Sequence, residues 1–377
     1  MTIAVLCPHF EDTGGVREVV AQVARAHAAA GHRIVIVSRA RSQTREPVPR
    51  FLPPGVEVWR VPVALAPHRG VGWREVRQFA RRFAQGGWAL AGRLHALAPD
   101  VVAAHCSKFH APWVIAARLG SRAPVVVHLH NAERTADGPP SPFWSRRLLA
   151  TADHVIAVSP AVAAYALATR PALAGRVSVV RNGIESRDVP APAAETRPRP
   201  YLVAVGRLAR QKGFDVLLDA LARLPGPATL VIAGDGPERT ALANQAQRLG
   251  LSKHVEFLGE VPHERVQALL RGAAAVVMPS RFEGNPLIAL EAMRAGATLV
   301  ASAIDGLPEE LCHGVTGVLV PPDDAGALAA ALAHLLADPV TSRRYGEAAA
   351  RAARTMPTWT DVAARILAVY ENVAHST

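Results

Sequence analysis

Short apolar runs recur along the chain, and each is followed by a segment in which apolar residues return at helical spacing. The first such unit has an apolar run at Thr2–Cys7, a polar loop at His9–Gly15, a helical pattern over Val16–Ala30 and a second apolar run at Arg33–Ser38. Short, almost wholly apolar runs are typical of strands buried on both faces. Because Gly31 is suited to end the helix, the pattern predicts a β–α–β unit at the start of an α/β domain.

The same alternation continues through the first half of the chain. Each further apolar run is separated from the next by a segment of helical pattern, which favours a parallel sheet covered by helices. Four more strands are predicted in this half, at Val101–Ala104, Val125–Leu129, His154–Val158 and Val177–Val180.

A polar, proline-rich stretch at Ser186–Pro200 interrupts the alternation, as expected of a linker between domains. We therefore predict one domain at residues 1–190, a linker at 191–200 and a second domain at 201–357, followed by a C-terminal helical segment at 358–377. In the second domain the strands are predicted at Tyr201–Val205, Thr229–Ala233, Val255–Leu258, Ala275–Met278, Thr298–Ser302 and Val318–Val320. Its helices are predicted at Phe214–Arg223, at Glu238–Leu249 and from Pro286 onward.

The predicted fold class is thus α/β, with two Rossmann-like parallel-sheet domains facing each other across a cleft. Ligands of open parallel sheets bind outside the carboxyl ends of the strands, so we expect the site in that cleft. The length of 377 residues, half of them hydrophobic, is sufficient to fill more than one core.

The formal net charge of +11 could indicate a nucleic acid or an anionic membrane as the partner. Nearly all of the positive charge is arginine, because the only lysines are Lys108, Lys212 and Lys253. The arginines are spread along the chain without a basic tail or interleaved aromatic residues, which argues against a nucleic-acid partner. A phosphorylated small molecule remains compatible with this charge.

Three cysteines, Cys7, Cys106 and Cys312, are too few and too far apart for a disulfide framework or a structural metal site. The amino-terminal stretch has no basic leader, and no apolar run is long enough to span a bilayer. We therefore expect a cytoplasmic protein without a transmembrane helix.

The segment Gly206–Gly213, GRLARQKG, directly follows the first strand of the second domain. It places a glycine turn and the cations Arg207 and Lys212 at the carboxyl end of a strand, where a diphosphate could bind. Both side chains can stabilise negative charge on a departing phosphate. The alternative is a solvated loop with ordinary surface cations.

The segment Arg281–Glu291, RFEGNPLIALE, combines a predicted helix start with two carboxylates. Asn285 followed by Pro286 is typical of an N-cap with proline at the first helical position. The free amides of that helix, including the amide of Leu287, favour a phosphate group. Glu283 precedes the helix and Glu291 lies within it, so each could accept hydrogen bonds from hydroxyl groups of one ligand. The alternative is an amphipathic helix with solvated glutamates.

These segments resemble the retaining glycosyltransferases of family 4, which have the GT-B fold. The resemblance is carried by the E-x7-E element in PSRFEGNPLIALEAM and by GRLARQKG, and it covers most of Tyr201–Asp338. Further segments are similar to the family pattern: VIAGDGPE at Val231–Glu238, VEFLGEV at Val255–Val261 and GVTGVLVPPDD at Gly314–Asp324.

The resemblance implies which residues bind a nucleotide-diphosphate sugar. The favoured nucleotide is UDP, and GDP is the alternative. Arg207 and Lys212 would bind the diphosphate, Glu283 the transferred sugar and Glu291 the ribose, with the main chain near Val261 at the base. The loop containing Gly284, Asn285, Pro286 and Leu287 would complete the donor site. By the same analogy, the C-terminal helix would cross back to the first domain.

In the first domain the resemblance is weaker, as expected if this domain binds the acceptor. Gly14-Gly15 before a helix offers unpaired amides and, by the resemblance, lies against the donor phosphates; the alternative is a flexible turn. His130, in VVVHLHNAE, matches the histidine beside the reacting sugar, although His128 could confuse the alignment. His105 is a candidate for acceptor binding, with a packing role as the alternative.

The expected reaction is front-face transfer that retains the anomeric configuration, because the first domain nominates no nucleophile for the opposite face of the sugar. Catalysis is assigned to His130, Glu283, Arg207 and Lys212. No cofactor is expected, and because the chain has no Asp-x-Asp element, activity is predicted to survive a chelator.

Two alternatives stay open. One is an epimerase or hydrolase of nucleotide sugars with the same fold, which would convert the donor without an acceptor. The other is a peripheral membrane transferase, whose basic segment Gly72–Arg93 would contact an anionic surface and a lipid acceptor. A core-facing helix with a solvated basic face explains that segment more simply. The acceptor, whether a small molecule, a lipid or a saccharide, and the oligomeric state are not readable from the sequence.

Overall fold

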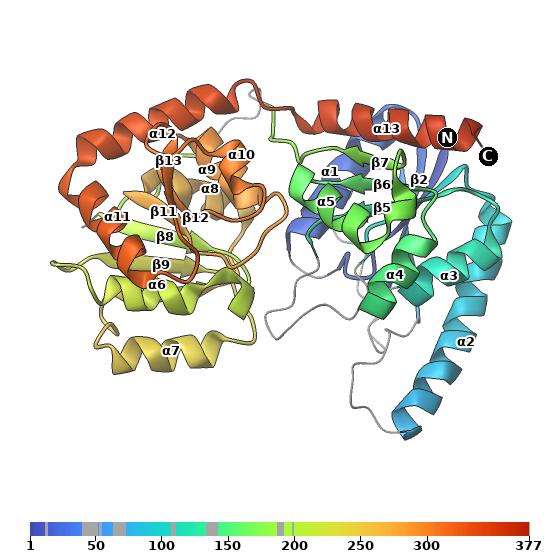
Figure 1. The fold of residues 1–377 in the computed structure, drawn as a ribbon, viewed down its shortest axis with the longest axis horizontal. Helices are drawn as coiled ribbons and strands as arrows, with labels where there is room; N and C mark the ends of the chain where they lie inside the picture. The colour runs from blue at the N-terminus through green and yellow to red at the C-terminus, as the bar shows by residue number, and fades with distance from the viewer. Residues whose placement is uncertain are drawn as a thin grey trace. The chain divides into compact units, whose positions relative to one another are not determined.

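A computed structural model describes residues 1–11, 14–39, 52, 55–62, 73–106, 111–132, 142–186, 192–197 and 200–376. The described chain forms two compact units. Of the described residues, unit 1 contains those up to Asn182 together with the C-terminal segment from Trp359, and unit 2 contains those from Gly183 to Thr358. Each unit is built around one parallel sheet with helices on both of its faces (Figure 1). The two sheets confirm the predicted α/β architecture.

Unit 1 contains a seven-stranded sheet with the order β3-β2-β1-β4-β5-β6-β7. All neighbouring strands in it are parallel. The strands are β1 Thr2–Leu6, β2 Arg33–Arg39, β3 Val56–Val61, β4 Val101–Ala104, β5 Val125–Leu129, β6 His154–Ala157 and β7 Val177–Val179. The helices are α1 Gly15–Ala29, α2 Trp73–Leu97, α3 Ala111–Gly120, α4 Pro142–Ala150, α5 Pro160–Thr169, the 3-10 turn η2 Pro171–Leu173 and α13 Trp359–His375.

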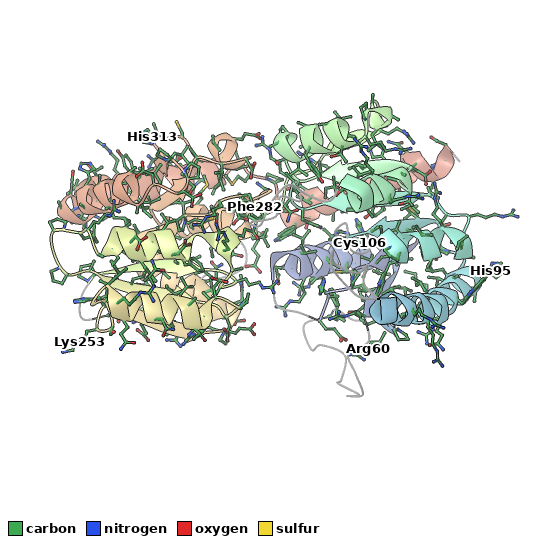
Figure 2. All side chains as sticks on the ribbon, turned by 60° about the horizontal axis from the view of Figure 1, so that its bottom comes forward. Arg60, His95, Cys106, Lys253, Phe282 and His313 are labelled. Carbon is green, nitrogen blue, oxygen red and sulfur yellow. The ribbon has the colours of Figure 1, made fainter. Side chains whose placement is uncertain are left out.

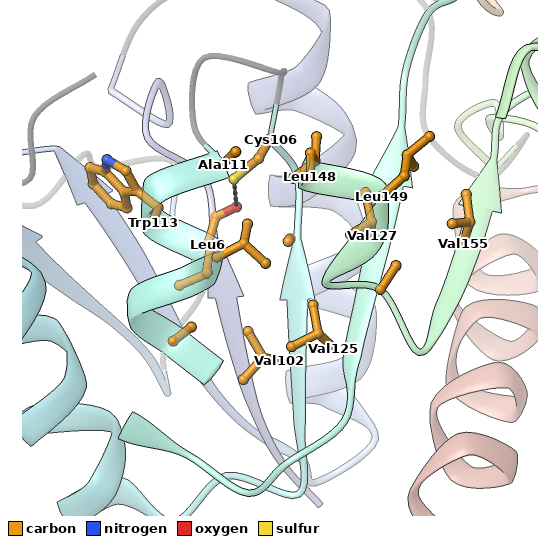
Figure 3. Close-up of a cluster of buried hydrophobic side chains, with 14 of the residues drawn as sticks. Leu6, Val102, Cys106, Ala111, Trp113, Val125, Val127, Leu148, Leu149 and Val155 are labelled. Carbon is orange, nitrogen blue, oxygen red and sulfur yellow. Dashed lines mark hydrogen bonds between the residues drawn. The ribbon is translucent and has the colours of Figure 1, made fainter. Parts of the chain in front are cut away.

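One face of this sheet packs against α2, α3, α4 and α5 around fully buried side chains that include Leu6, Val102 and Trp113 (Figure 3). The Cys106 thiol donates a hydrogen bond to the Leu6 carbonyl at 3.6 Å, in the same cluster. The opposite face is covered by α1 and α13, which pack against each other. Helices therefore bury both faces of the sheet. Because consecutive side chains of a strand point to opposite faces, nearly every strand residue is buried and the strands are almost wholly apolar.

Unit 2 contains a six-stranded parallel sheet with the order β10-β9-β8-β11-β12-β13. The strands are β8 Tyr201–Val205, β9 Thr229–Ala233, β10 Val255–Gly259, β11 Ala275–Met278, β12 Leu299–Ser302 and β13 Gly317–Val320. The helices are the 3-10 turn η3 Arg210–Lys212, α6 Phe214–Leu221, α7 Arg239–Arg248, α8 His263–Gly272, α9 Leu287–Ala295, α10 Leu307–Glu310, α11 Ala325–Ala337 and α12 Pro339–Ala353.

Alternate residues of the unit 2 strands belong to separate cores. Leu202 and Ala204 of β8 join the core beneath α6, α7 and α11, whereas Tyr201 and Val203 join the core beneath α8, α9 and α12. Strand order reverses beside β8, which pairs with β9 on one side and β11 on the other. The carboxyl ends of these strands therefore form the switch point at which α/β sheets bind ligands.

The proline-rich segment lies on unit 2 in its described part, residues 192–197. The amide of Glu195 donates to the carbonyl of Ala268 in α8 at 2.9 Å, and the carbonyl of Glu195 accepts from the Tyr201 hydroxyl at 3.2 Å. Arg197 forms ion pairs with Glu195 and Glu256. Residues 192–197 are therefore bound to unit 2 by specific hydrogen bonds.

In the described part of the chain, no single helix has both the length and the apolar composition needed to cross a membrane. The consecutive helices α11 and α12 meet those criteria only when taken together, and they are bent by 102° at their junction. Leu328, Leu332 and Leu335 of α11 are buried in the core of unit 2.

Candidate active site

The loop after β8 places Lys212 at the carboxyl edge of the unit 2 sheet. Gly213 has the left-handed φ of 64°, and a Cβ atom added there would lie 2.0 Å from the carbonyl oxygen of Pro279. At Gly206 an added Cβ would lie 3.3 Å from Cε of Lys212. Glycine is therefore needed at Gly213 for the close approach of this loop to the end of β11.

Lys212 and Glu283 form an ion pair. Nζ of Lys212 lies 2.6 Å from Oε1 of Glu283, which also accepts a hydrogen bond of 2.8 Å from the Ser280 hydroxyl. The side chains of Lys212 and Glu283 are 19% and 8% exposed, so the carboxylate is largely withdrawn from water. The structure thus brings together the two residues that the family resemblance assigned to the diphosphate and the sugar.

The loops that carry these two residues are cross-linked. The Arg281 amide donates to the Gln211 carbonyl at 2.8 Å, and the Gln211 side chain donates to the Phe282 carbonyl at 3.0 Å. The Arg281 guanidinium donates to both carboxylate oxygens of Asp215, at 2.9 and 2.7 Å. Burial acts to raise the pKa of Asp215, but the hydrogen bonds and charge of Arg281 outweigh it and lower that pKa. The pair is therefore charged near neutral pH and holds the two loops together.

Asp305, in the loop after β12, holds the backbone of Glu283. Its Oδ2 accepts a hydrogen bond of 2.9 Å from the Glu283 amide. Asp305 has a φ of 43°, a left-handed conformation that costs a residue with a Cβ about 1–3 kcal/mol. The surrounding structure keeps this strained residue where its carboxylate fixes the loop of Glu283.

The helix after this loop, α9, begins one residue later than predicted. Leu287 is its first residue and Pro286 its N-cap, so the prediction that Asn285 is the N-cap and Pro286 the first helical residue is wrong. The Asn285 side chain instead donates to Oε1 of Glu310 at 3.2 Å. Proline at the N-cap restricts the residue before it to extended backbone. Asn285 therefore stays outside the helix, where its side chain bonds Glu310 of α10.

Pro286, the N-cap of α9, has no side-chain acceptor and makes no capping hydrogen bond to the helix amides. The amides of its first turn, with the positive end of the helix dipole, can therefore bind an anionic group. Together with Lys212 and the largely buried carboxylate of Glu283, this edge of unit 2 can bind a phosphate beside a hydroxyl-bearing group.

The other predicted residues of unit 2 follow the ends of strands or lie on α9. Arg207 is exposed after β8, Glu291 is half-buried on α9, and Val261 is half-buried after β10. Gly284 is buried between Glu283 and Asn285. Sequence reasoning missed Ser280 and Asp305, although both follow strand ends, which is the positional signal that could have identified them.

In unit 1, Gly14 and Gly15 lie at the amino end of α1. Gly15 is the first helical residue, and Gly14 is the N-cap, with a φ of 150° and no side chain to bond the helix amides. A Cβ at Gly14 would meet nothing within 4 Å, so this position faces open space. The amide groups of this turn can therefore be approached by a ligand.

His105, His128 and His130, here called the histidine cluster, lie at or near the carboxyl ends of the adjacent strands β4 and β5 in unit 1. Nδ1 of His105 and Nε2 of His130 are 2.9 Å apart, a hydrogen bond. The His105 ring stacks on the His128 ring with centroids 4.0 Å apart. His128 is buried within β5, whereas His130 follows the strand and is partly exposed, so His130 is the one that can contact a ligand.

Dense surroundings keep the histidine cluster neutral. Burial lowers the pKa of His130 to about 4. Burial, followed by repulsion between neighbouring imidazoles, lowers the pKa of His105 and of His128 well below its ordinary value. At neutral pH each ring therefore carries one N–H donor and one acceptor nitrogen.

This predicts that unit 1 loses stability in mild acid. Histidines whose folded pKa lies below the unfolded value of 6.5 take up protons on unfolding, so stability falls as the pH drops through 6.5 toward about 4. We expect the melting temperature at pH 5 to lie at least about 3 °C below that at pH 7 by scanning calorimetry. The drop should be smaller in His128→Phe, and a melting temperature independent of pH in this range would contradict the prediction.

Comparison with protein-family models gives two matches that together span most of the chain. The family described as "Glycosyl transferases group 1" matches residues 187–352, and "Glycosyltransferase Family 4" matches residues 13–188. The two matches meet close to the division between unit 1 and unit 2.

Similar curated proteins include a glycogen synthase of Mycobacterium tuberculosis, 32% identical over 380 residues. That alignment covers 95% of this chain and 91% of the relative. A D-inositol 3-phosphate glycosyltransferase of Mycobacterium bovis is 33% identical over 255 residues, covering 62% of this chain and 52% of the relative.

Similar solved structures include sucrose-phosphate synthase from Thermosynechococcus elongatus, with a TM-score of 0.85 at 23% identity and coverage of 100% of both chains. Anabaena Alr3699/HepE in complex with UDP and glucose has a TM-score of 0.78 at 23% identity, covering 99% of this chain and 100% of that one. At this level of identity the likeness concerns the fold.

Proposed function

Because this chain belongs to the family 4 glycosyltransferases and has their GT-B fold, we propose that it transfers a sugar from UDP to an acceptor hydroxyl with retention of anomeric configuration. It is a glycosyltransferase that uses a nucleotide-sugar donor. The acceptor class stays open between a small molecule, a lipid and a saccharide.

The observation that carries the proposal is the pairing of Lys212 with Glu283 in the loop that leads into α9, whose N-cap Pro286 makes no side-chain hydrogen bond to the helix amides. In the proposed complex, Lys212, Arg207 and the first-turn amides of α9 bind the diphosphate. Glu283 accepts hydrogen bonds from hydroxyl groups of the sugar, and Glu291 from those of the ribose. A carboxylate bonds a hydroxyl more strongly than a neutral acceptor does, which suits it to hold the sugar in one orientation.

UDP is proposed as the carrier because Alr3699/HepE, which shares the fold over nearly its whole length, was solved with UDP and with UDP-glucose. The main chain near Val261, after β10, is proposed to contact the base. Binding of UDP and GDP, compared by calorimetry, tests this choice. Tighter binding of GDP would contradict the choice of base, and binding of neither would contradict the donor site.

For the chemical step we propose front-face substitution. The bond from the anomeric carbon to the diphosphate oxygen breaks, and the bond to the acceptor oxygen forms on the same face of the sugar. The acceptor proton passes to the departing phosphate oxygen, whose negative charge Lys212 and Arg207 stabilise. His130 is proposed to contact the transferred sugar from unit 1, and no metal ion is needed.

Product analysis tests both parts of this mechanism. We expect the NMR coupling of the anomeric proton in the product to show the configuration of the donor, and the rate to be unchanged by a chelator. An inverted product would overturn front-face transfer, and loss of activity that added Mg²⁺ restores would overturn metal independence. Conversion of the donor without acceptor would instead indicate an epimerase or a hydrolase.

A further inference from the structure

A series of buried contacts connects the C-terminal helix α13 to His130 within unit 1. The Tyr370 hydroxyl of α13 lies 2.7 Å from Nε2 of His128. The His128 ring stacks on the ring of His105, and Nδ1 of His105 bonds Nε2 of His130 at 2.9 Å. Residues of β5, of the end of β4 and of α13 are thus connected to the partly exposed imidazole of His130.

The hydrogen bond between His105 and His130 determines which ring nitrogen of His130 can meet a ligand. A neutral imidazole has one N–H and one lone pair, so in this bond one nitrogen donates and the other accepts. Nε2 of His130 is used by His105. Only Nδ1 of His130 is left to hydrogen bond a substrate group, and its role as donor or acceptor is decided by the bond at Nε2.

The partner ring is itself held rigidly. The backbone amide of His105 donates to the Leu6 carbonyl of β1 at 2.9 Å, and its buried side chain stacks on the ring of His128. His128 and Tyr370 are 3% and 1% exposed. Burial also raises the pKa of the Tyr370 hydroxyl, so this group stays protonated and can donate to His128. The orientation of His105 is therefore set by its backbone hydrogen bond and by the stack on the buried ring of His128.

We propose that His105 is a positioning residue that fixes the tautomer and ring orientation of His130, so that Nδ1 of His130 hydrogen bonds the transferred sugar. This inference rests on the proposed function, because it assigns His130 to the sugar. His105 then acts through His130 and does not itself contact the acceptor. His128 stacks on His105, and Tyr370 of α13 bonds His128, so the C-terminal helix contributes to the position of His105.

The first test is independent of activity. In protein labelled with ¹⁵N-histidine, long-range ¹H–¹⁵N spectra distinguish a protonated ring nitrogen from an unprotonated one. We expect one tautomer of His130 in the native protein and averaged nitrogen signals in His105→Leu. His105→Asn, whose amide can replace Nδ1 as a hydrogen-bonding group, should retain one tautomer. Averaged signals in the native protein, or unchanged signals in His105→Leu, would overturn the proposal.

The second test separates positioning from folding. With a nucleotide-sugar donor, His105→Leu should lower kcat by about 10–100-fold, because a small misplacement of a contacting group has effects of this size. Nucleotide diphosphate binding should change less than about twofold, because Lys212 and Arg207, proposed to bind the diphosphate, do not belong to the histidine cluster, and His105→Asn should recover most of the rate.

His154→Leu is the matched control. His154 is another histidine of the same sheet, bonded to the Ser178 hydroxyl at 2.8 Å and not to His130. It should keep the native kcat, and a loss equal to that of His105→Leu would overturn the positioning role. A native protein that transfers no sugar from any donor would contradict the proposed function, whereas the ring-nitrogen signals would still decide whether His105 fixes His130.

Discussion

Glu283→Gln is expected to lower kcat by about 10²–10³-fold, the loss typical of removing one preorganised electrostatic contact from an active site. Glutamine has the shape of glutamate and can still accept from the Ser280 hydroxyl, so the loop should keep its conformation. What is lost is the charge that pairs with Lys212 and the strong acceptor proposed for the sugar. Steady-state kinetics at saturating donor measures the effect.

Glu256→Gln provides the control. Glu256 also belongs to unit 2 and also forms an ion pair, with Arg197, but its side chain is 48% exposed on the edge strand β10. This variant should retain native kcat. If Glu283→Gln kept its rate within about threefold of native, the carboxylate would have no part in the chemical step.

Lys212→Ala is expected to weaken nucleotide diphosphate binding by about 10–100-fold, because a hydrogen bond to a charged group contributes about 1.5–3 kcal/mol. The value of kcat should fall as well, since the same ammonium stabilises the departing phosphate. Calorimetric titration and steady-state kinetics on the same preparation measure the two effects.

Two further variants separate binding from stability. Lys253→Ala is the matched control: Lys253 is exposed before β10, whereas Lys212 follows β8 next to the segment of Phe282, and Figure 2 shows Lys253 and Phe282 at opposite ends of unit 2. Lys212→Ala leaves the largely buried Glu283 without its cation, which lowers the melting temperature. Adding Glu283→Gln should restore stability but not binding. Full binding by Lys212→Ala would contradict the proposed diphosphate site.

Much of the fold could be predicted from the sequence because central strands of both sheets are buried on two faces. Val101–Ala104, Val125–Leu129 and Thr229–Ala233 appear at the predicted bounds. The edge strand β3, Val56–Val61, was missed. Four of its six residues are half-buried, and Glu57 and Arg60 interrupt the apolar run, so the continuous apolar signal is absent there.

The site was predictable in part. Arg207 and Lys212, in the loop after β8, and Glu283, before α9, could be found because each follows a recognisable strand or precedes a recognisable helix. The helix start was misplaced by one residue, because the Asn-Pro pattern also permits proline at the N-cap. In the structure Pro286 is the N-cap, and the side chain of Asn285 bonds Glu310 of α10, a contact that the local sequence does not show. The roles of Ser280 and Asp305 depend on loops that are brought together only by folding.

By itself, the sequence determined the class of the two sheets and the places along the chain where ligand-binding groups can stand, because burial periodicity and helix-start chemistry are local properties. Only the tertiary structure decided which of those groups are partners: Lys212 with Glu283, Glu283 with Asp305, and His130 with His105. These pairs join residues separated by 71, 22 and 25 positions. Hydrogen bonds over such separations depend on strand order and on the close approach of loops, which no local pattern specifies.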